Sequence, residues 1–264
     1  MKYDKELKDI VRNKYAEIAE ANNSCGCCGT SSKVIEYSIM QDDYSELNGY
    51  VKDADLGLGC GVPTEYAGIK KGDRVVDLGS GAGNDAFVAR ALVGDEGKVI
   101  GIDFTEEMIR KANWNNLKVG FNNVEFKLGE IEKLPLEENS LDVVISNCVL
   151  NLVPDKKKAF SEIYRVLNKN GHFCVSDIVL KGELPEKLKA SAEMYAGCVA
   201  GAVQQEDYLK IIKETGFENL EIKRTKVIEL PDNILSEYLN EEDIRKFKNN
   251  NIGIFSITVV GYKN

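Results

Sequence analysis

The residues with the clearest chemical potential stand together in the stretch Asp77-Leu-Gly-Ser-Gly-Ala-Gly83, which overlaps the end of a short apolar run. Glycines at alternate positions allow a tight turn and let the backbone approach a ligand closely. A helix expected from Asn84 onward points its N-terminus at the same place, where a negative ligand group is favoured. A strand, a glycine turn and a helix in this order are typical of a nucleotide-type site.

The acids around the glycines separate this site from a dinucleotide site. The pattern G-x-G-x-x-G needs a glycine at position 84, where the chain has Asn84. Asp77 sits two residues before the first glycine. A carboxylate there repels a pyrophosphate but suits a ligand with an ammonium group. Asp103 ends the next predicted strand, roughly 20 residues on, at the position expected to bind ribose hydroxyls. We therefore predict a site for a nucleoside with an amino-acid tail rather than for NAD.

Seven cysteines form the second group of reactive side chains. In a reducing compartment they are metal-binding, catalytic or simply buried rather than a disulfide framework. Cys148 follows a predicted strand, at the edge where ligands bind in open α/β sheets. Cys60 lies in a second glycine-rich stretch, Leu56–Pro63, whereas Cys174 lies inside an apolar strand and is expected to be a small buried hydrophobe. Spacing alone slightly favours the interpretation that these are unrelated buried thiols over the interpretation that they share one site.

Composition argues against several classes of protein. A net charge of -9 over 264 residues argues against a nucleic-acid groove. No apolar run approaches the length of a membrane span, and the N-terminus is charged rather than apolar, so we expect a cytoplasmic protein without a membrane partner. The single histidine, His172, excludes a His-rich metal site and any mechanism that needs two histidines. We expect it to be structural.

The elements that must position these residues follow a regular pattern. From position 57 onward, strands alternate with helices. The alternation predicts an α/β fold with a doubly wound, mostly parallel, Rossmann-like sheet and helices on both faces. We expect an antiparallel C-terminal strand and an N-terminal helical segment. The chain then divides into a helical, cysteine-bearing segment, 1–56, and a domain, 57–264, with a helical insertion at about 182–202.

Hydrophobic periodicity and turn residues define the expected elements. Strands are expected at Arg74–Leu78, Lys98–Asp103, Val124–Leu128, Leu141–Asn147, His172–Val179, Leu220–Ile228 and Ile252–Tyr262. Helices are expected over 3–21, 84–92, 106–114, 156–170, 182–202 and 207–215, with a partial helix between 231 and 251. Thr105 and Asp155 are predicted N-caps, and Gly171 is the predicted stop of the helix after Asp155.

Four motifs carry a resemblance to a known family. The stretches Gly57-Leu-Gly-Cys-Gly-Val-Pro63, Gly129-Glu-Ile-Glu-Lys-Leu-Pro135, Ser146-Asn-Cys-Val-Leu-Asn-Leu152 and Gly197-Cys-Val-Ala-Gly-Ala202 resemble the arsenite S-adenosylmethionine methyltransferases, in the class I methyltransferase superfamily. The likeness runs from the N-terminal helix to about Val227. The glycine loop by itself indicates only the superfamily. The C-terminal part is shorter than in longer family members, so the likeness implies no extra C-terminal function.

The resemblance implies roles for the cysteines. In that family three cysteines bind trivalent arsenic, and a further N-terminal cysteine takes part in redox steps. The matching arsenic ligands here are Cys60, Cys148 and Cys198. The candidates for the redox cysteine are Cys25, Cys27 and Cys28, and the sequence does not choose among them.

The resemblance also implies S-adenosyl-L-methionine as the methyl donor, with no metal cofactor. Asp77 is expected at its methionine part and Asp103 at its ribose. Met108 is equally well explained as core, and Glu130 as a solvated loop acid. The expected cofactor-binding residues are Asp77, Gly79, Ser80, Gly81, Asp103, Phe104, Met108, Glu130, Ile131 and Asn147.

The implied chemistry is coherent. Trivalent arsenic is thiophilic, so thiolates are suitable ligands. Three thiolates leave a lone pair on arsenic that can attack a sulfonium methyl group, so no general base is needed. Catalysis then comes from in-line geometry and a dry pocket. Expected partners are arsenite or an arsenic–thiol adduct as substrate and a thiol reductant such as thioredoxin or glutathione.

Two other functions stay open from the sequence. One is a methyltransferase for a small organic acceptor with incidental cysteines. The other is a thiolate metalloid-binding protein without transfer activity. The intact glycine loop and Asp103 argue against the second.

Overall fold

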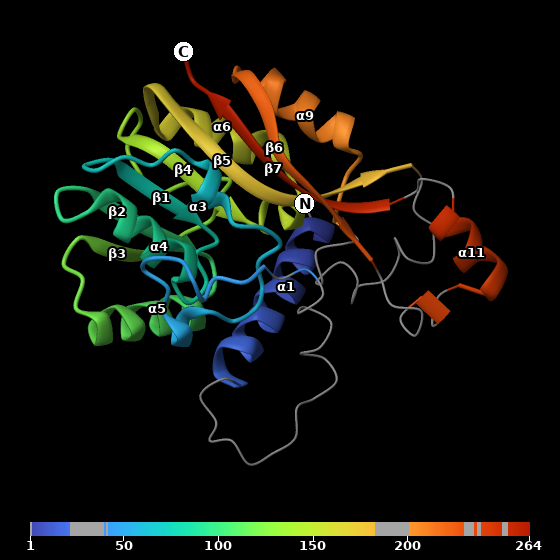
Figure 1. The fold of residues 1–264 in the computed structure, drawn as a ribbon, viewed down its shortest axis with the longest axis horizontal. Helices are drawn as coiled ribbons and strands as arrows, with labels where there is room; N and C mark the ends of the chain where they lie inside the picture. Colours follow the sequence, from blue (N-terminus) through green and yellow to red (C-terminus); the bar gives the residue numbers. More distant parts are fainter. Residues whose placement is uncertain are drawn as a thin grey trace.

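A single seven-stranded sheet organises the protein in the computed structural model, which describes residues 2–21, 40, 42–182, 201–229, 235–236, 239–249 and 253–264. The strands are β1 (Arg74–Leu78), β2 (Lys98–Asp103), β3 (Val124–Leu128), β4 (Leu141–Asn147), β5 (Leu167–Lys181), β6 (Glu218–Ile228) and β7 (Gly253–Tyr262). Their spatial order is β3-β2-β1-β4-β5-β7-β6 (Figure 1).

The strand order makes this a doubly wound sheet. β1 pairs in parallel with both β2 and β4, and Val76 lies opposite Ile100 on one side and Val144 on the other. β7 is antiparallel to both of its neighbours, as expected for the C-terminal strand. The chain direction across the sheet reverses between β1 and β4. At such a switch point the connections diverge and leave a crevice beyond the strand ends, which is where ligands bind in this class of sheet.

Helices cover both faces because alternate strand residues point to opposite sides. Val75 shares an apolar cluster with residues of α3 (Pro63–Tyr66), α4 (Asn84–Val93) and α5 (Glu106–Val119), whereas Val76 shares one with residues of α6 (Lys156–Val166) and α9 (Gln205–Glu214). Figure 1 shows α4 and α5 together on one side of the sheet and α6 and α9 on the other. The predicted fold class is therefore confirmed.

The N-terminal helix α1 (Lys2–Ala21) lies against the domain rather than apart from it. Lys111 of α5 donates a hydrogen bond to the Ala19 carbonyl oxygen (3.1 Å), and Val11 is buried. The remaining elements are the short helices η1 (Lys52–Ala54) and η2 (Leu150–Leu152) and the helix α11 (Glu241–Asn249). Within the described ranges, no helix combines the length and apolarity needed to span a bilayer.

The first four strands lie where the sequence predicts them, but the helix after Asp155 does not end as predicted. It stops at Val166 rather than Gly171, because Leu167 adopts an extended backbone and begins β5 opposite Leu141. Burying Leu167 in the sheet outweighs its helical periodicity. Consequently β5 is longer than the predicted His172–Val179 at both ends.

The other differences are smaller. The helix α5 runs past Trp114 to Val119, and Gly120 ends it in the left-handed conformation. Sequence analysis missed α3, η1 and η2, each three or four residues long. Residues 183–200 of the predicted helical insertion lie outside the described residues, so that prediction stays untested.

The N-cap of α6 gives a test of this local structure. Asp155 Oδ1 accepts a hydrogen bond from the Lys158 backbone N–H (2.9 Å), so Asp155→Ala should lower the free energy of unfolding by about 1 kcal/mol in urea denaturation. Asp155→Asn keeps the acceptor and should stay close to the wild type. Equal losses in both variants would contradict the capping role.

Candidate active site

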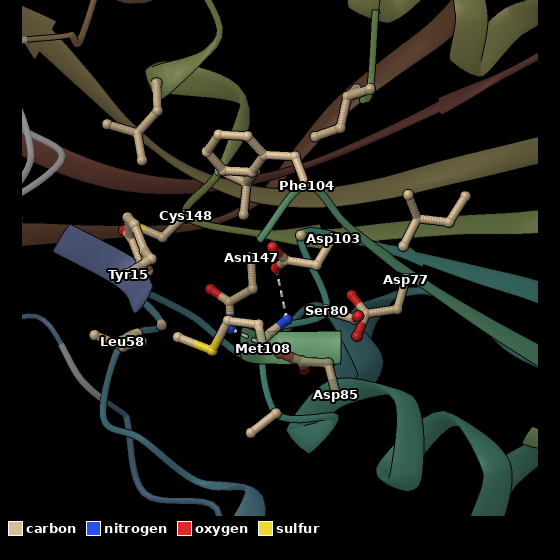
Figure 2. A pocket seen from close by; sticks show the side chains of 18 of the residues that line it. Tyr15, Leu58, Asp77, Ser80, Asp85, Asp103, Phe104, Met108, Asn147 and Cys148 are labelled. Carbon is tan, nitrogen blue, oxygen red and sulfur yellow. Dashed lines mark hydrogen bonds between the residues drawn. The ribbon is translucent and has the colours of Figure 1, made fainter. Parts of the chain in front are cut away.

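A cavity opens at the carboxyl ends of β1 to β4, where the crevice of a doubly wound sheet is expected (Figure 2). Each of these strands is followed by a loop that contributes to its wall. All of the predicted cofactor-binding residues line it: Asp77, Gly79, Ser80, Gly81, Asp103, Phe104, Met108, Glu130, Ile131 and Asn147. Parallel strands thus bring together residues that are up to 70 positions apart in the chain.

The glycine turn after β1 forms the floor of this cavity. Gly79 has φ +70°, and the backbone N–H groups of Gly79 and Ser80 both donate to the Ile102 carbonyl oxygen (2.7 and 3.0 Å). A Cβ atom on Gly79 would overlap the Val149 side chain. Glycine is required here both for the left-handed backbone and for the close approach of the next loop.

Asp103 is held in place by backbone donors. Its Oδ2 accepts from the Gly81 N–H (3.0 Å) and its Oδ1 from the Thr105 N–H (2.8 Å), so the carboxylate is fixed to the glycine turn (Figure 2). Burial raises the pKa of Asp103, while these backbone donors oppose that rise. Thr105 occupies the N-cap of α5 as predicted, although its side chain makes no capping bond.

Three buried polar atoms on the cavity wall are without a hydrogen-bond partner among the described residues: Asp77 Oδ2, Ser80 Oγ and Asn84 Oδ1. Burial raises the pKa of Asp77 well above its ordinary value, and the nearby carboxylates of Asp85 and Asp103 raise it further. Unpaired buried polar atoms are costly unless a ligand satisfies them. This arrangement suits a ligand that brings an ammonium group, which would pair with Asp77 and supply donors.

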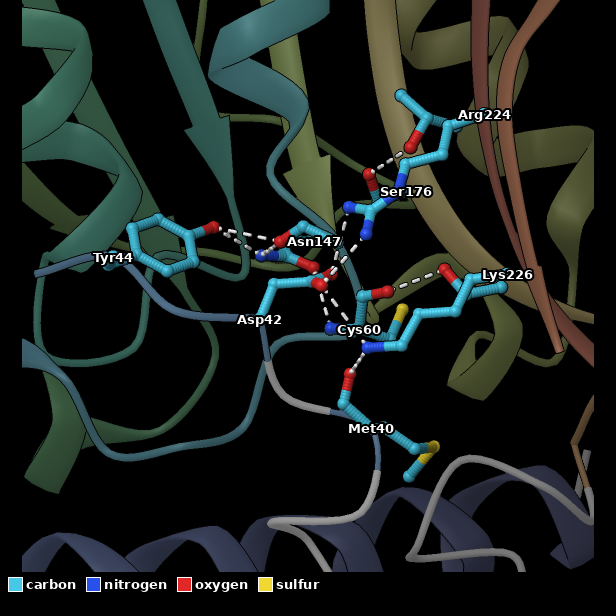
Figure 3. Close-up of polar contacts among 11 residues, drawn as sticks. Met40, Asp42, Tyr44, Cys60, Asn147, Ser176, Arg224 and Lys226 are labelled. Atoms are coloured by element: carbon cyan, nitrogen blue, oxygen red, sulfur yellow. Dashed lines mark hydrogen bonds and ion pairs between the residues drawn. The ribbon is translucent and has the colours of Figure 1, made fainter. Parts of the chain in front are cut away.

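Asn147 connects the cavity to the cysteine-bearing loop. Its Nδ2 lies 3.0 Å from Asp85 Oδ2 and 2.8 Å from the Gly61 carbonyl oxygen, and its Oδ1 accepts from the Cys60 N–H (3.0 Å) (Figure 3). The Tyr44 hydroxyl completes this network, 2.8 Å from both Asn147 Nδ2 and Asp85 Oδ1. Asn147 therefore lines the cavity, while its amide is engaged by the protein itself.

Tyr44 and Asp85 are site residues that the sequence analysis missed. Burial raises the pKa of Asp85 to about 6, while its hydrogen bonds to Asn147 and Tyr44 pull it down. Burial also raises the pKa of Tyr44 well above its ordinary value. The available signal for Asp85 was its place in the first helical turn after the glycines. Tyr44 stands in a segment without periodicity, so no local pattern pointed to it.

Two of the predicted arsenic-binding cysteines belong to one buried cluster. Cys148 lines the cavity, and Cys60 belongs to the same buried apolar cluster, which also contains Leu152 and Ile178. Cys148 has φ +61°, which is unusual for a non-glycine residue, and its N–H donates to the Ser176 carbonyl oxygen (2.7 Å). Cys60 and Cys148 are 0% and 2% exposed, so both thiols are shielded from bulk water.

The other cysteines and the histidine fall elsewhere. Cys174 belongs to a different apolar cluster, and its thiol donates to the Pro63 carbonyl oxygen (3.2 Å), which confirms it as a buried hydrophobe. The ring of His172 contacts the Ala67 carbonyl oxygen and stacks on Tyr262, outside the residues that line the cavity. The predicted site residues Cys25, Cys27, Cys28 and Cys198 lie outside the described residues.

The helix α1 covers part of the cavity. Lys8, Val11 and Tyr15 line it, and Tyr15 packs against the cluster that holds Cys148 (Figure 2). Lys8 forms ion pairs with Glu132 and Glu130, the latter at 2.8 Å. Glu130 therefore pairs with Lys8 of α1. The sequence analysis had interpreted Glu130 either as a cofactor-binding residue or as a solvated loop acid, and neither interpretation included this ion pair.

Comparison with known proteins now identifies the class. Residues 69–216 match a family described as a methyltransferase domain. An arsenic(III) S-adenosylmethionine methyltransferase from Chlamydomonas reinhardtii has a similar structure, with a TM-score of 0.68 and 32% identity over 89% of this chain and 75% of that one. The fold and the glycine turn at its switch point are those of a class I, S-adenosylmethionine-dependent methyltransferase domain.

Sequence relatives narrow the family. An arsenite methyltransferase from Halobacterium salinarum is 41% identical over 82% of this chain, and one from Aquipseudomonas alcaligenes is 31% identical over 89%. The chain belongs to the arsenite methyltransferase family. It spans 59% and 69% of the lengths of these two relatives.

The buried Asp85 predicts a pH dependence of stability. Its folded-state pKa of about 6 lies above the ordinary value near 4, so its contribution to stability is present below about pH 4 and is lost as the pH rises through 6. In urea unfolding, the wild type should lose about 2 kcal/mol relative to Asp85→Asn between pH 4 and pH 7. A difference between the two proteins that stays constant with pH would contradict this assignment.

Proposed function

We propose that the protein transfers a methyl group from S-adenosylmethionine, bound in this cavity, to trivalent arsenic held by Cys60, Cys148 and Cys198. The observation that carries the proposal is the position of Cys148. It follows β4 directly, lines the cavity, and shares a buried apolar cluster with Cys60. Family membership supports the same reaction.

The cavity wall offers a complementary partner to each part of the methyl donor. Asp77 pairs with the ammonium group, whose charge offsets the burial of that carboxylate. Asp103 retains acceptor capacity for the ribose hydroxyls beyond its two backbone donors. Phe104 and Met108 flank the adenine, with Glu130 and Ile131 at its edge. The bound donor supplies an electrophilic sulfonium methyl group.

The third arsenic ligand is proposed from chain connectivity. Ala202 packs against the cluster that contains Cys60 and Cys148. Cys198 precedes it by four residues, and four residues span at most about 14 Å. The two described thiols and the short reach of Cys198 support a three-thiol site at the base of the cavity.

The apolar surroundings suit this substrate. Arsenite exchanges three hydroxyl groups for three thiol sulfurs and releases three water molecules, so the bound complex is neutral and tolerates burial. The arsenic lone pair attacks the methyl carbon, the methyl–sulfur bond breaks, and S-adenosylhomocysteine leaves as a neutral thioether, so no proton has to be removed. The chain contributes position and exclusion of water, in keeping with a site that contains no histidine.

The later steps involve the remaining thiols. Methylation raises arsenic from the trivalent to the pentavalent state. Two thiols that close to a disulfide supply the two electrons that return it, with one of Cys25, Cys27 and Cys28 as a participant. A thiol reductant such as thioredoxin or glutathione then reopens the disulfide. The cycle serves arsenic detoxification in the cytoplasm, with 57–264 as the methyltransferase domain.

The decisive experiment compares two cysteines. S-adenosylhomocysteine formation is measured with arsenite and glutathione in wild type, Cys148→Ser and Cys174→Ser. Cys148→Ser should lose at least 100-fold in turnover, because a hydroxyl is a poor ligand for a thiophilic element. Cys174→Ser is the matched control, since it is equally buried and its hydroxyl can still donate to Pro63.

Each outcome has a distinct meaning. Arsenite-dependent turnover that fails only in Cys148→Ser supports the proposal. A wild type that binds S-adenosylmethionine but gives no turnover with arsenite would overturn it and favour an organic acceptor. Tight arsenite binding without transfer would favour a metalloid-binding protein.

The glycine turn gives a second test. Gly79→Ala should raise the Kd for S-adenosylmethionine at least tenfold, because the added Cβ displaces Val149 beside Cys148. Gly94→Ala is the matched control, because Gly94 has the same φ of +70° but no neighbouring atom within 4 Å of the added Cβ. Calorimetric titration of both variants separates backbone strain, which they share, from the close approach. Equal Kd values would contradict the role of Gly79.

A further inference from the structure

Behind the turn that carries Cys148 lies a cluster of buried and partly buried polar side chains that the proposed reaction does not use. Asp177 of β5 is 1% exposed, Tyr208 of α9 is fully buried, and Lys156 begins α6. None of the three is among the described residues that line the cavity. Burying a charged group away from a ligand lowers the stability of the fold, so these groups are candidates for a functional role.

The cluster binds both backbone polar groups of a single residue, Asn151. Lys156 Nζ donates to the Asn151 carbonyl oxygen (2.8 Å) and to the Val153 carbonyl oxygen (3.0 Å). The Asn151 backbone N–H donates to the Asp177 carboxylate. Asn151 is fully buried in the centre of η2, the short helix that begins two residues after Cys148.

Further contacts hold the Asp177 carboxylate in place. The Tyr208 hydroxyl donates to Asp177 Oδ2 (2.8 Å), and Lys156 is the oppositely charged group that acts on Asp177. Burial raises the pKa of Asp177 to about 7 and lowers that of Lys156. The carboxylate is therefore anchored from α9 as well as from its own strand.

The contacts to Asn151 lie three residues after Cys148, whose backbone is strained. Cys148 holds φ +61°, a conformation that a cysteine does not keep without support from its surroundings. One support is local, because the Cys148 N–H donates to the carbonyl oxygen of Ser176, the neighbour of Asp177 in β5. The other is the fixed η2 turn. Together they attach the segment that follows β4 to β5 at two points.

We propose that Lys156 and Asp177 are positioning residues that clamp the Asn151 backbone and thereby hold the Cys148 thiol in the orientation needed to bind arsenic. This inference rests on the proposed function, because it assigns Cys148 to the substrate. It extends that function to residues outside the cavity. Tyr208 supports the clamp through its hydrogen bond to Asp177.

The test measures KM for arsenite and for S-adenosylmethionine in Asp177→Asn, Lys156→Met and Tyr208→Phe. The two charge variants should raise KM for arsenite at least tenfold and change KM for S-adenosylmethionine less than twofold. Tyr208→Phe should raise KM for arsenite by a smaller factor. Lys157→Met is the matched control, because Lys157 is the next residue of α6 and pairs with Glu214 at the surface.

A double variant separates a clamp from two independent effects. Lys156 and Asp177 attract each other and hold opposite backbone groups of Asn151, so either single change already releases most of the clamp. The rise in KM for arsenite in Lys156→Met/Asp177→Asn should be smaller than the product of the two single rises. A rise equal to the product would contradict a shared clamp.

A readout that needs no arsenic keeps this inference distinct from the proposed function. The alkylation rate of Cys148 by iodoacetamide, followed by mass spectrometry, should rise at least fivefold relative to that of Cys174 in the charge variants. If wild type does not methylate arsenite but this rate rises, the proposed function fails and the clamp stands. Unchanged alkylation and unchanged KM for arsenite in folded variants would overturn the clamp.

Discussion

The site depends on one side-chain amide. Asn147, at the end of β4, binds the Cys60 backbone through its oxygen, while its nitrogen faces Asp85 and Tyr44. These contacts tie the glycine-rich loop before the domain, the first turn of α4 and the segment around position 44 to the end of a central strand. The amide thus ties the Cys60 N–H to the end of β4, while the Ser256 hydroxyl of β7 donates to the Cys60 carbonyl oxygen.

Concentrated negative charge is the second constraint. Asp77, Asp85 and Asp103 are all buried at one edge of the sheet, and burial raises the pKa of each. Backbone donors and the Asn147 amide offset part of that penalty, but Asp77 Oδ2 keeps no partner among the described residues. A positively charged ligand offsets the cost of burying these carboxylates, so the electrostatics of the cavity favour cationic ligands.

Local sequence patterns predicted an element correctly wherever the residues within that element determined its bounds. The first four strands begin and end as predicted, because apolar runs bounded by turn residues leave few alternatives. The end of α6 was not predictable in this way. Leu167 continues the helical pattern, yet the chance to pair with Leu141 in the sheet converts it to a strand residue. That competition involves a partner 26 positions away.

The sequence by itself determined the class of site. The glycine turn, Asp77 and Asp103 specify their ligand chemistry through spacing along one strand–turn–helix–strand unit, which is local information. Only the tertiary structure decided which other groups meet there. The packing of the loop before the domain and of α4 against the end of β4 puts Cys148 and Cys60 in one buried cluster and places Asp85 against Asn147. Contacts between such distant segments depend on strand order and packing rather than on spacing in the chain.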